Sequence, residues 1–283
     1  MKVFLTGGTG FIGCHVLRSL LNSGFTVRAL RRTSYSKTPI ELSLEPEWCE
    51  GSLDKIEPGW LRGVDVIIHL AAAGVTPKLC TWEELIQVNI LGASKLIQMA
   101  AESRVKRFIA IGTSHEYGSS AEGYTKIPPN APLKPINTYS ASKAAAFHMM
   151  RSLAIEAKIE FFYGRIFTAY GEGQFARNFW PSLRDAALKG EDFPMTSGKQ
   201  ITDFVPVEQV ASQILHACTR NDLKKGIPFV LNIGSGKARS LLEFAESEWI
   251  RLNARGRLLP KSLPDRANQV YRLVPDLQGL EMG

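Results

Sequence analysis

The feature that most constrains the fold of this chain is a glycine-rich turn directly after its first apolar run. The run KVFLT at residues 2–6 is followed by GGTGFIG, with glycines at positions 7, 10 and 13. Gly7 permits a tight turn with positive φ, Gly10 leaves room for a pyrophosphate beside the backbone, and Gly13 lets helix and strand pack closely. A helix N-terminus also presents free N–H groups to an anion. The turn therefore predicts a dinucleotide site, with a purely structural turn as the alternative.

The residues up to about position 165 alternate short β-branched runs with longer helical patterns. The expected strands are 2–6, 25–30, 65–71, 107–112 and 159–166, and the expected helices are Ile12–Asn22, Trp82–Ser103 and Ser140–Lys158. Strand–helix alternation predicts right-handed βαβ units, and near-continuous apolar strands are typical of parallel sheets covered on both faces. We therefore predict an α/β fold built on a Rossmann-like, doubly wound parallel sheet.

After Arg165 this rhythm ends, and Gly and Pro become frequent. Helical patterns return only at Phe179–Lys189, Val207–Thr219 and Leu241–Leu252. We expect residues 1–165 to form an NAD(P)-binding Rossmann domain. Residues 166–283 are expected to form a smaller, irregular C-terminal substrate lobe that is interleaved with the first domain.

Composition disfavours several other classes of protein. No apolar run approaches the roughly 18 residues that span a bilayer, and the N-terminus lacks the apolar region of a signal peptide, so we expect a cytoplasmic protein without membrane contact. Four scattered cysteines without a C-x-x-C pair predict neither a disulfide framework nor a metal site. The net charge of +7 is dispersed and not interleaved with aromatic residues, which disfavours nucleic acid and suits a small polyanionic ligand.

The end of the second expected strand bears on the choice of nucleotide. NAD sites carry an acidic residue there, which binds the ribose hydroxyls. This strand ends in Arg31 and Arg32, and the next carboxylate along the chain is Glu41. Two guanidinium groups suit the additional 2′-phosphate of NADP. The sequence therefore favours NADP(H), while NAD stays possible if the arginines are merely solvated.

The stretch YSASK places Tyr139 and Lys143 four residues apart at the start of an expected helix. Residues at i and i+4 share one helix face. A neighbouring ammonium favours the phenolate, so we expect the pKa of Tyr139 to fall from about 10 toward neutrality. Such a phenol can give or take a proton at a carbonyl or alcohol oxygen.

In combination, these motifs resemble the extended short-chain dehydrogenase/reductase family, in particular its nucleotide-sugar epimerases, dehydratases and reductases. The resembling segments are TGGTGFIG (6–13), HLAA (69–72), VNILGAS (88–94), GTSHEYG (112–118), YSASK (139–143), GRIFTAYGEG (164–173), TDFVPVEQVA (202–211) and LNIGSGKARS (231–240). The resemblance implies a nucleotide-diphosphate sugar as substrate and a catalytic triad of Thr113, Tyr139 and Lys143. It also implies a homodimer formed through the helices at 82–103 and 140–158.

Further contacts follow from the same resemblance. The implied cofactor-binding residues are Gly7, Gly10, Phe11, Ile12, Gly13, Arg31, Arg32, Ser52, Leu53, Leu70, Ala71, Ala72, Asn89, Tyr139, Lys143 and Ile166. The implied substrate-binding residues are Ser114, His115 and Asn178. Glu116 and Tyr117 are expected to pack locally, and His69 is expected to pack or to bond to the backbone.

The chain departs from the family pattern just after Thr113. Family dehydratases carry acidic groups there, whereas this chain has Ser114 and His115, which disfavours a 4,6-dehydratase. His115 is either a substrate contact, a second proton donor or an ordinary loop histidine.

Two other departures affect binding. An aspartate that the family carries is replaced by Ser52 in the stretch EGSLD (50–54), and the resemblance leaves Leu53 to pack on the adenine. The arginine that the family uses for the substrate diphosphate is replaced by Thr202, and Arg177 or Lys199 could compensate.

Three functions remain open at this stage. The first is an NADPH-dependent reductase of a nucleotide-linked 4-keto-6-deoxy sugar, because Arg31 and Arg32 favour NADP. The second is a nucleotide-sugar 4-epimerase that retains NAD. The third is a catalytically idle nucleotide-binding regulator, against which the intact set of Thr113, Tyr139 and Lys143 argues.

Overall fold

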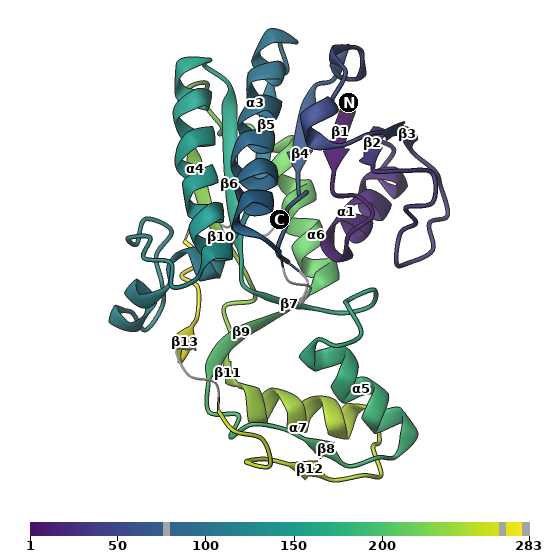
Figure 1. Cartoon of the computed structure of the whole chain (residues 1–283), viewed down its shortest axis with the longest axis vertical. Coiled ribbons are helices and arrows are strands. Elements are labelled where there is room, and N and C mark those ends of the chain that lie inside the picture. The colour runs from purple at the N-terminus through teal and green to yellow at the C-terminus, as the bar shows by residue number, and fades with distance from the viewer. Residues whose placement is uncertain (76–79, 266–269, 279–283) are drawn as a thin grey trace.

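A computed structural model describes residues 1–75, 80–265 and 270–278 of the chain (Figure 1). Seven parallel strands form its central sheet, in the order β10-β6-β5-β4-β1-β2-β3. They are β1 (Lys2–Thr6), β2 (Thr26–Arg31), β3 (Glu47–Glu50), β4 (Val66–His69), β5 (Arg107–Thr113), β6 (Glu160–Ile166) and β10 (Phe229–Ile233). The predicted Rossmann-like parallel sheet is confirmed.

Helices cover both faces of this sheet. The helices α1 (Phe11–Asn22) and α6 (Val207–Thr219) pack on one face, and α3 (Ala93–Glu102) and α4 (Thr138–Glu156) pack on the other. Side chains alternate along each strand, so Ile109 of β5 joins the core beneath α1 and α6, while Phe108 joins the core beneath α3 and α4. Burial on both faces explains the near-continuous apolar runs of the sequence.

The expected helix at 82–103 is divided into three parts. It begins with α2 (Trp82–Leu85), continues as a π-helical segment at Ile86–Gly92, and ends as α3. Thr81 and Glu84 form a capping box that starts α2. π-Helical turns often lie at functional sites, and this one contains Asn89, which is buried.

The second lobe contains a small mixed sheet and two helices. The sheet consists of β7 (Thr168–Tyr170), β9 (Ile201–Pro206), β11 (Ala238–Ser240) and β13 (Arg272–Leu273), and β8 (Phe193–Pro194) pairs with β12 (Leu258–Leu259). The helices are α5 (Phe179–Lys189) and α7 (Leu241–Arg251). Phe204 and Phe244 stack with ring centroids 3.9 Å apart in the core between this sheet and these helices. Short 3₁₀ turns elsewhere include η1 (Leu53–Lys55), η2 (Pro58–Leu61), η4 (Ser114–Glu116) and η5 (Ser119–Gly123).

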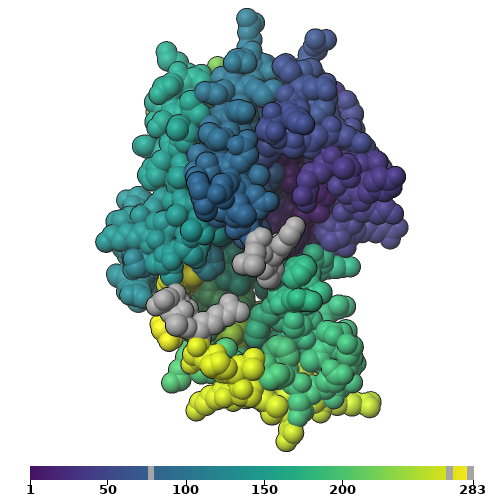
Figure 2. Space-filling model, in the orientation of Figure 1, coloured from purple at the N-terminus to yellow at the C-terminus, as the bar shows by residue number. Residues whose placement is uncertain are grey.

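The two lobes share the chain beyond residue 165. Although α6 and β10 follow that position in the sequence, α6 packs on α1, and β10 pairs with β6 at the edge of the large sheet. The second lobe lies below the carboxyl ends of the parallel strands, where β6 leads directly into β7 (Figures 1 and 2). Within the described ranges, no helix combines the length and the apolar character that crossing a membrane requires.

Candidate active site

The glycine turn has the geometry that a pyrophosphate requires. Gly7 has φ of +78°, and a Cβ there would lie 2.6 Å from the backbone N of Ala71, so the turn packs against the end of β4. A Cβ on Gly13 would overlap the carbonyl oxygen of Gly7. Gly10 is different, because it is exposed and a Cβ there would meet only that same oxygen, at 3.3 Å. The exposed backbone at Gly10, just before the N-terminus of α1, fits the approach of a dinucleotide phosphate.

The residues implied to bind a cofactor gather along the carboxyl edge of the sheet. The implied cofactor residues that follow β4 are held by Thr6 of β1. Its Oγ1 accepts a hydrogen bond from the Ala71 N–H (3.3 Å). The same hydroxyl is hydrogen-bonded to Nδ1 of His69 (2.8 Å). Burial lowers the pKa of His69 to about 3, so this histidine is neutral. His69 is therefore a packed residue that joins β4 to β1.

Arg31 makes an ion pair that the sequence did not reveal. Its Nη2 donates to Oε1 of Glu50 (2.6 Å), and its guanidinium lies 5.1 Å from the ring centroid of Trp48. Glu50 ends β3 and is directly opposite Arg31 in the sheet. Arg32 is exposed. A carboxylate thus lies at the end of β2 after all, although it is supplied by the neighbouring strand.

Asn89 connects the loop after β4 to the helix of the YSASK motif. Its Oδ1 accepts from the Ala73 N–H (2.8 Å), and its Nδ2 donates to the Ala73 carbonyl (3.2 Å). The same Nδ2 donates to Oγ of Ser142 (2.9 Å). Leu53, another residue of the implied cofactor set, is buried where it contacts Gly92 at the end of the π-helical segment.

Tyr139 and Lys143 lie in the first turns of α4, which Asn137 caps by accepting from the Ser140 N–H (2.9 Å). Lys143 is buried, and its Nζ donates to the carbonyl of Ile111 in β5 (2.8 Å). Tyr139 is half-buried beside Gly74 of the loop after β4. The helix therefore brings the phenol and the ammonium to the carboxyl ends of β4 and β5.

The expected lowering of the Tyr139 pKa is wrong. Burial and the negative charge of Glu116 raise the pKa of Tyr139 to about 12. The ammonium of Lys143 is directed at the Ile111 carbonyl, and burial lowers the pKa of Lys143 itself. The phenol is consequently protonated at neutral pH.

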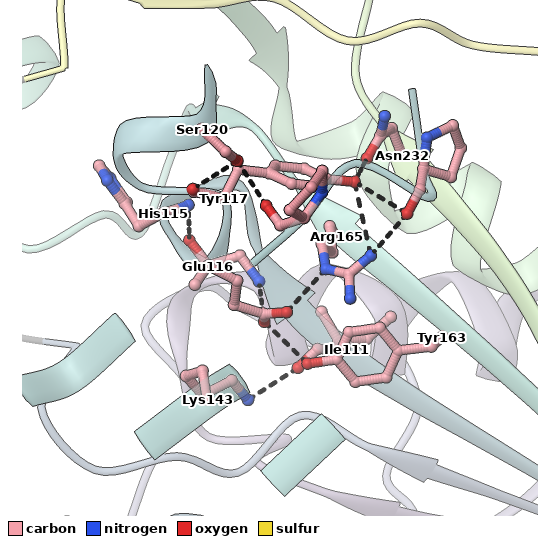
Figure 3. Close-up of polar contacts among 12 residues, drawn as sticks. Ile111, His115, Glu116, Tyr117, Ser120, Lys143, Tyr163, Arg165 and Asn232 are labelled. Atoms are coloured by element: carbon pink, nitrogen blue, oxygen red, sulfur yellow. Dashed lines mark hydrogen bonds and ion pairs between the residues drawn. The ribbon is translucent and has the colours of Figure 1, made fainter. Parts of the chain in front are cut away.

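A buried ion pair lies beneath the end of β5 (Figure 3). Glu116 has no exposed surface, and its Oε2 accepts from Nε of Arg165 (2.7 Å), which is 1% exposed. Its Oε1 accepts from the Tyr163 hydroxyl (2.8 Å) and from the Thr113 N–H (2.9 Å). The carboxylate therefore joins η4 to both β5 and β6.

Glu116 and Tyr117 were expected to pack locally, and Glu116 does bind the nearby Thr113 N–H, but both also bind residues distant in the chain. Tyr117 is buried, and its hydroxyl donates to Oδ1 of Asn232 in β10 (2.6 Å). Arg165 lies 5.1 Å from the Tyr117 ring centroid and donates to the Pro129 carbonyl (3.0 Å). Sequence reasoning missed Arg165 and Asn232, although an arginine inside the apolar run EFFYGRI signals a buried partner.

The other residues of the strand-end motif are placed as follows. Thr113 ends β5 and is half-buried, and its Oγ1 accepts from the His115 N–H (3.3 Å). Ser114 is buried, whereas His115 is exposed and its ring points away from the Glu116 carboxylate (Figure 3). Their roles toward a substrate stay predictions.

The implied diphosphate residues lie in the second lobe. Asn178 precedes α5 and makes no capping bond with its side chain. Thr202 shares a hydrogen bond with Thr168, with 3.0 Å between the two hydroxyl oxygens. Arg177 and Lys199 are exposed. Their part in binding, like the part of Ile166 at the end of β6, stays a prediction.

The fold and the strand-end motifs define a nucleotide-binding enzyme of the Rossmann type. The chain belongs to the NAD dependent epimerase/dehydratase family, whose model matches residues 3–234. The predicted extended short-chain dehydrogenase/reductase membership is thereby confirmed.

Two curated relatives and one solved structure illustrate the range of similar proteins. The chain is 29% identical over 256 residues to the low-salt glycan biosynthesis protein Agl12 of Haloferax volcanii, covering 87% of this chain and 81% of the relative. It is 28% identical over 270 residues to the dTDP-glucose 4,6-dehydratase of Neisseria gonorrhoeae, covering 87% and 76%. The structure of MoeE5 in complex with UDP-glucuronic acid and NAD superposes with a TM-score of 0.85 at 27% identity, covering 99% of this chain and 91% of that one.

Gly10→Ala and Gly13→Ala separate binding from folding at the turn. Gly13→Ala forces a Cβ into the Gly7 carbonyl, so we expect a melting temperature at least several degrees lower, on the order of 4 °C per kcal/mol. Gly10→Ala places its methyl group 3.3 Å from the Gly7 oxygen, a tight contact that a small shift relieves, so we expect it to melt much closer to the wild type than Gly13→Ala but to bind dinucleotide at least about tenfold more weakly. Thermal melts and cofactor titration measure both effects. Equal dinucleotide affinity in Gly10→Ala and wild type would contradict this assignment of the phosphate site.

Proposed function

We propose that the protein is an NADPH-dependent reductase of a nucleotide-linked 4-keto-6-deoxy sugar. The observation that carries this proposal is the absence of a free carboxylate among the described residues of the strand-end motif. Positions 114 and 115 are serine and histidine, and Glu116 is fully buried and bonded to three partners. Elimination of water from a sugar needs an acid or base that reaches the substrate. The motif offers no such carboxylate, even though several relatives are dehydratases.

The protonation state of Tyr139 supports the reductive direction. Reduction of a ketone needs a proton donor at the carbonyl oxygen, whereas an epimerase or dehydratase that oxidises an alcohol first needs a proton acceptor. Burial and Glu116 raise the pKa of Tyr139 to about 12, which keeps the phenol in the donor form.

In the proposed mechanism, the phenol of Tyr139 donates its proton to the sugar carbonyl oxygen as negative charge develops there. The hydroxyl of Thr113 donates a hydrogen bond to the same oxygen and orients it. Lys143 would hold the ribose of the nicotinamide nucleotide, and the glycine turn and the N-terminus of α1 would hold its pyrophosphate. When bound, the reduced cofactor supplies the hydride.

A nucleotide-sugar 4-epimerase that retains NAD is the second candidate, and one observation favours it. The ion pair with Glu50 engages the guanidinium of Arg31 and places a carboxylate at the ribose end of the site, as in NAD enzymes. The exposed Arg32 and the donor form of Tyr139 favour the reductase. A catalytically idle regulator would have no need for Tyr139 beside the buried Lys143.

A homodimer formed through 82–103 and 140–158 is part of the proposal. The helices α3 and α4 lie side by side on one face of the sheet (Figure 1). Large apolar side chains are exposed along the two ranges 82–103 and 140–158, among them Trp82 on α2, Leu91 in the π-helical segment and Met149 on α4. Burial of these side chains against a second copy would remove them from water.

A panel of nucleotide-linked 4-keto-6-deoxy sugars tests the proposed function. With NADPH present, we expect at least one of these ketosugars to be reduced, measured as the loss of absorbance at the reduced nicotinamide band. A protein that keeps NAD through purification, ignores NADPH and interconverts 4-epimers would instead be the epimerase.

Replacement of Tyr139 by Phe tests the proton donor. The substitution removes only the hydroxyl, so we expect turnover to fall by about 10²–10⁴-fold with cofactor affinity unchanged. Steady-state kinetics and a cofactor titration measure the two quantities. Retained turnover in Tyr139→Phe would remove Tyr139 from the mechanism.

Glu50→Gln tests the part that Arg31 plays in cofactor choice. Loss of the carboxylate frees the guanidinium for a 2′-phosphate, so the affinity for NADPH relative to NADH is expected to rise about tenfold, or about 1.4 kcal/mol. Glu47→Gln is a matched control, because Glu47 pairs with Arg28 at the other end of β3 (2.6 Å). If both variants show the wild-type ratio of affinities, Arg31 does not contact a 2′-phosphate.

A further inference from the structure

We propose that Glu116, paired with Arg165, is a positioning residue of this active site: it fixes the strand end that carries Thr113 and supplies the negative charge beneath Tyr139 and Lys143. The inference rests on the proposed function for its kinetic consequence, but its structural part stands on contacts within the chain.

The first contact positions Thr113. Glu116 and Thr113 form a reciprocal capping box, in which the Glu116 carboxylate accepts from the Thr113 N–H (2.9 Å). Gly112 makes this possible, because a Cβ there would collide with Glu116 Oε1 and with the hydroxyl of Tyr163. The glycine before Thr113 is therefore required for a carboxylate to lie beneath the strand, and that carboxylate fixes the turn that begins at Thr113.

The second contact extends to the helix that carries the phenol. The guanidinium of Arg165 lies 4.5 Å from the ring centroid of Phe147 on α4 and 5.2 Å from that of Tyr163 on β6. On the same side, Lys143 donates to the Ile111 carbonyl of β5. One buried ion pair thus packs between the end of β5 and the helix α4, which carries Lys143 (Figure 3).

The charge of Glu116 acts on both titratable groups of α4. The titratable groups on the elements around α4 are His69 on β4, Arg107 on β5, Glu116 in η4 with His115 and Tyr117 beside it, Glu160, Tyr163 and Arg165 on β6, Glu83 and Glu84 on α2, and Lys95 and Glu102 on α3. The acidic groups of α2 and α3 are exposed, and the buried Glu160 is paired with Arg107 at the amino end of the sheet, so Glu116 is the buried carboxylate at the carboxyl edge among these groups. Its charge raises the pKa of Tyr139 and opposes the lowering of the Lys143 pKa by burial.

A second buried ion pair on the same two strands is a natural control. Arg107 and Glu160 begin β5 and β6, lie directly opposite each other, and are bonded at 2.8 Å. This pair lies at the amino end of the sheet, away from the carboxyl edge where ligands bind in such folds. Both are buried Arg–Glu ion pairs, but they lie at opposite ends of the sheet.

The experiment compares Glu116→Gln with Glu160→Gln. A proton donor is active while protonated, so activity is lost as the pH rises through the pKa of Tyr139. Removal of the Glu116 charge lowers that pKa, and we expect the alkaline limb of the pH profile for kcat to move down by about one pH unit. We expect kcat to fall more than KM changes, and Glu160→Gln to keep the wild-type profile.

A direct titration separates this inference from the proposed function. Tyrosinate absorbance, with the Tyr139→Phe protein as the background, reports the ionisation of Tyr139 without any substrate. We expect it at lower pH in Glu116→Gln than in Glu160→Gln, even if no ketosugar is reduced by the wild type. In that case the proposed function fails and the inference about Glu116 stands.

A double variant covers the case in which Glu116→Gln does not fold, since Arg165 would be left buried without its partner. Glu116→Gln with Arg165→Met removes both charges at similar volume and is expected to fold and to show the same downward shift. Unchanged ionisation of Tyr139 in the variants that fold, relative to Glu160→Gln, would overturn the inference.

Discussion

A carboxylate without exposed surface is compatible with a folded protein only where donors and cations replace its hydration. Glu116 obtains these partners from Arg165, Tyr163 and the backbone of Thr113. Arg165 in turn needs acceptors and aromatic faces, which the segment after η4 and the helix α4 supply. Breaking such a buried pair destabilises a protein by about 3–5 kcal/mol, so the ends of β5 and β6 are held in one arrangement. The Thr113 hydroxyl and the Tyr139 phenol are proposed to act on substrate. They lie on β5 and α4, and this ion pair contacts both elements.

The position of the crevice for the dinucleotide follows from the order of the strands. The connections from β1 and β4 lead to opposite faces of the sheet, because β1 continues into α1 and β4 continues toward α2 and α3. Ligands in doubly wound sheets bind in the crevice at this point. Gly7 contacts the backbone of Leu70 and Ala71 across the crevice, so the two loops approach too closely there for a side chain. The exposed Gly10 then lies just before the N-terminus of α1.

Most of the large sheet could be predicted from the sequence, because its strands are strongly apolar and its helices strongly periodic. The place of α6 and β10 could not be read from their own residues, since it depends on packing against α1 and β6. The ion pair of Arg31 was missed for a similar reason. The short strand β3, EWCE, carries no pattern of its own, and its Glu50 becomes a neighbour of Arg31 only through strand pairing. Likewise, helical spacing placed Tyr139 and Lys143 on one helix, but the pKa of Tyr139 depends on Glu116, which another strand end supplies.

The two buried ion pairs on β5 and β6 show why charge in an apolar strand has to be interpreted by position. In parallel strands, residues at the amino ends meet at one edge of the sheet and residues at the carboxyl ends meet at the other. Arg107 and Glu160 meet at the amino edge, where they bind each other and, through Arg107, the carbonyls at the end of α6. Glu116 and Arg165 meet at the carboxyl edge, next to a phenol and an ammonium. Negative charge at that edge makes it harder for the phenol to lose its proton. A tyrosine in this field stays protonated up to higher pH, so the same pairing that stabilises the strand ends also keeps the phenol in the form from which the proposed reduction starts.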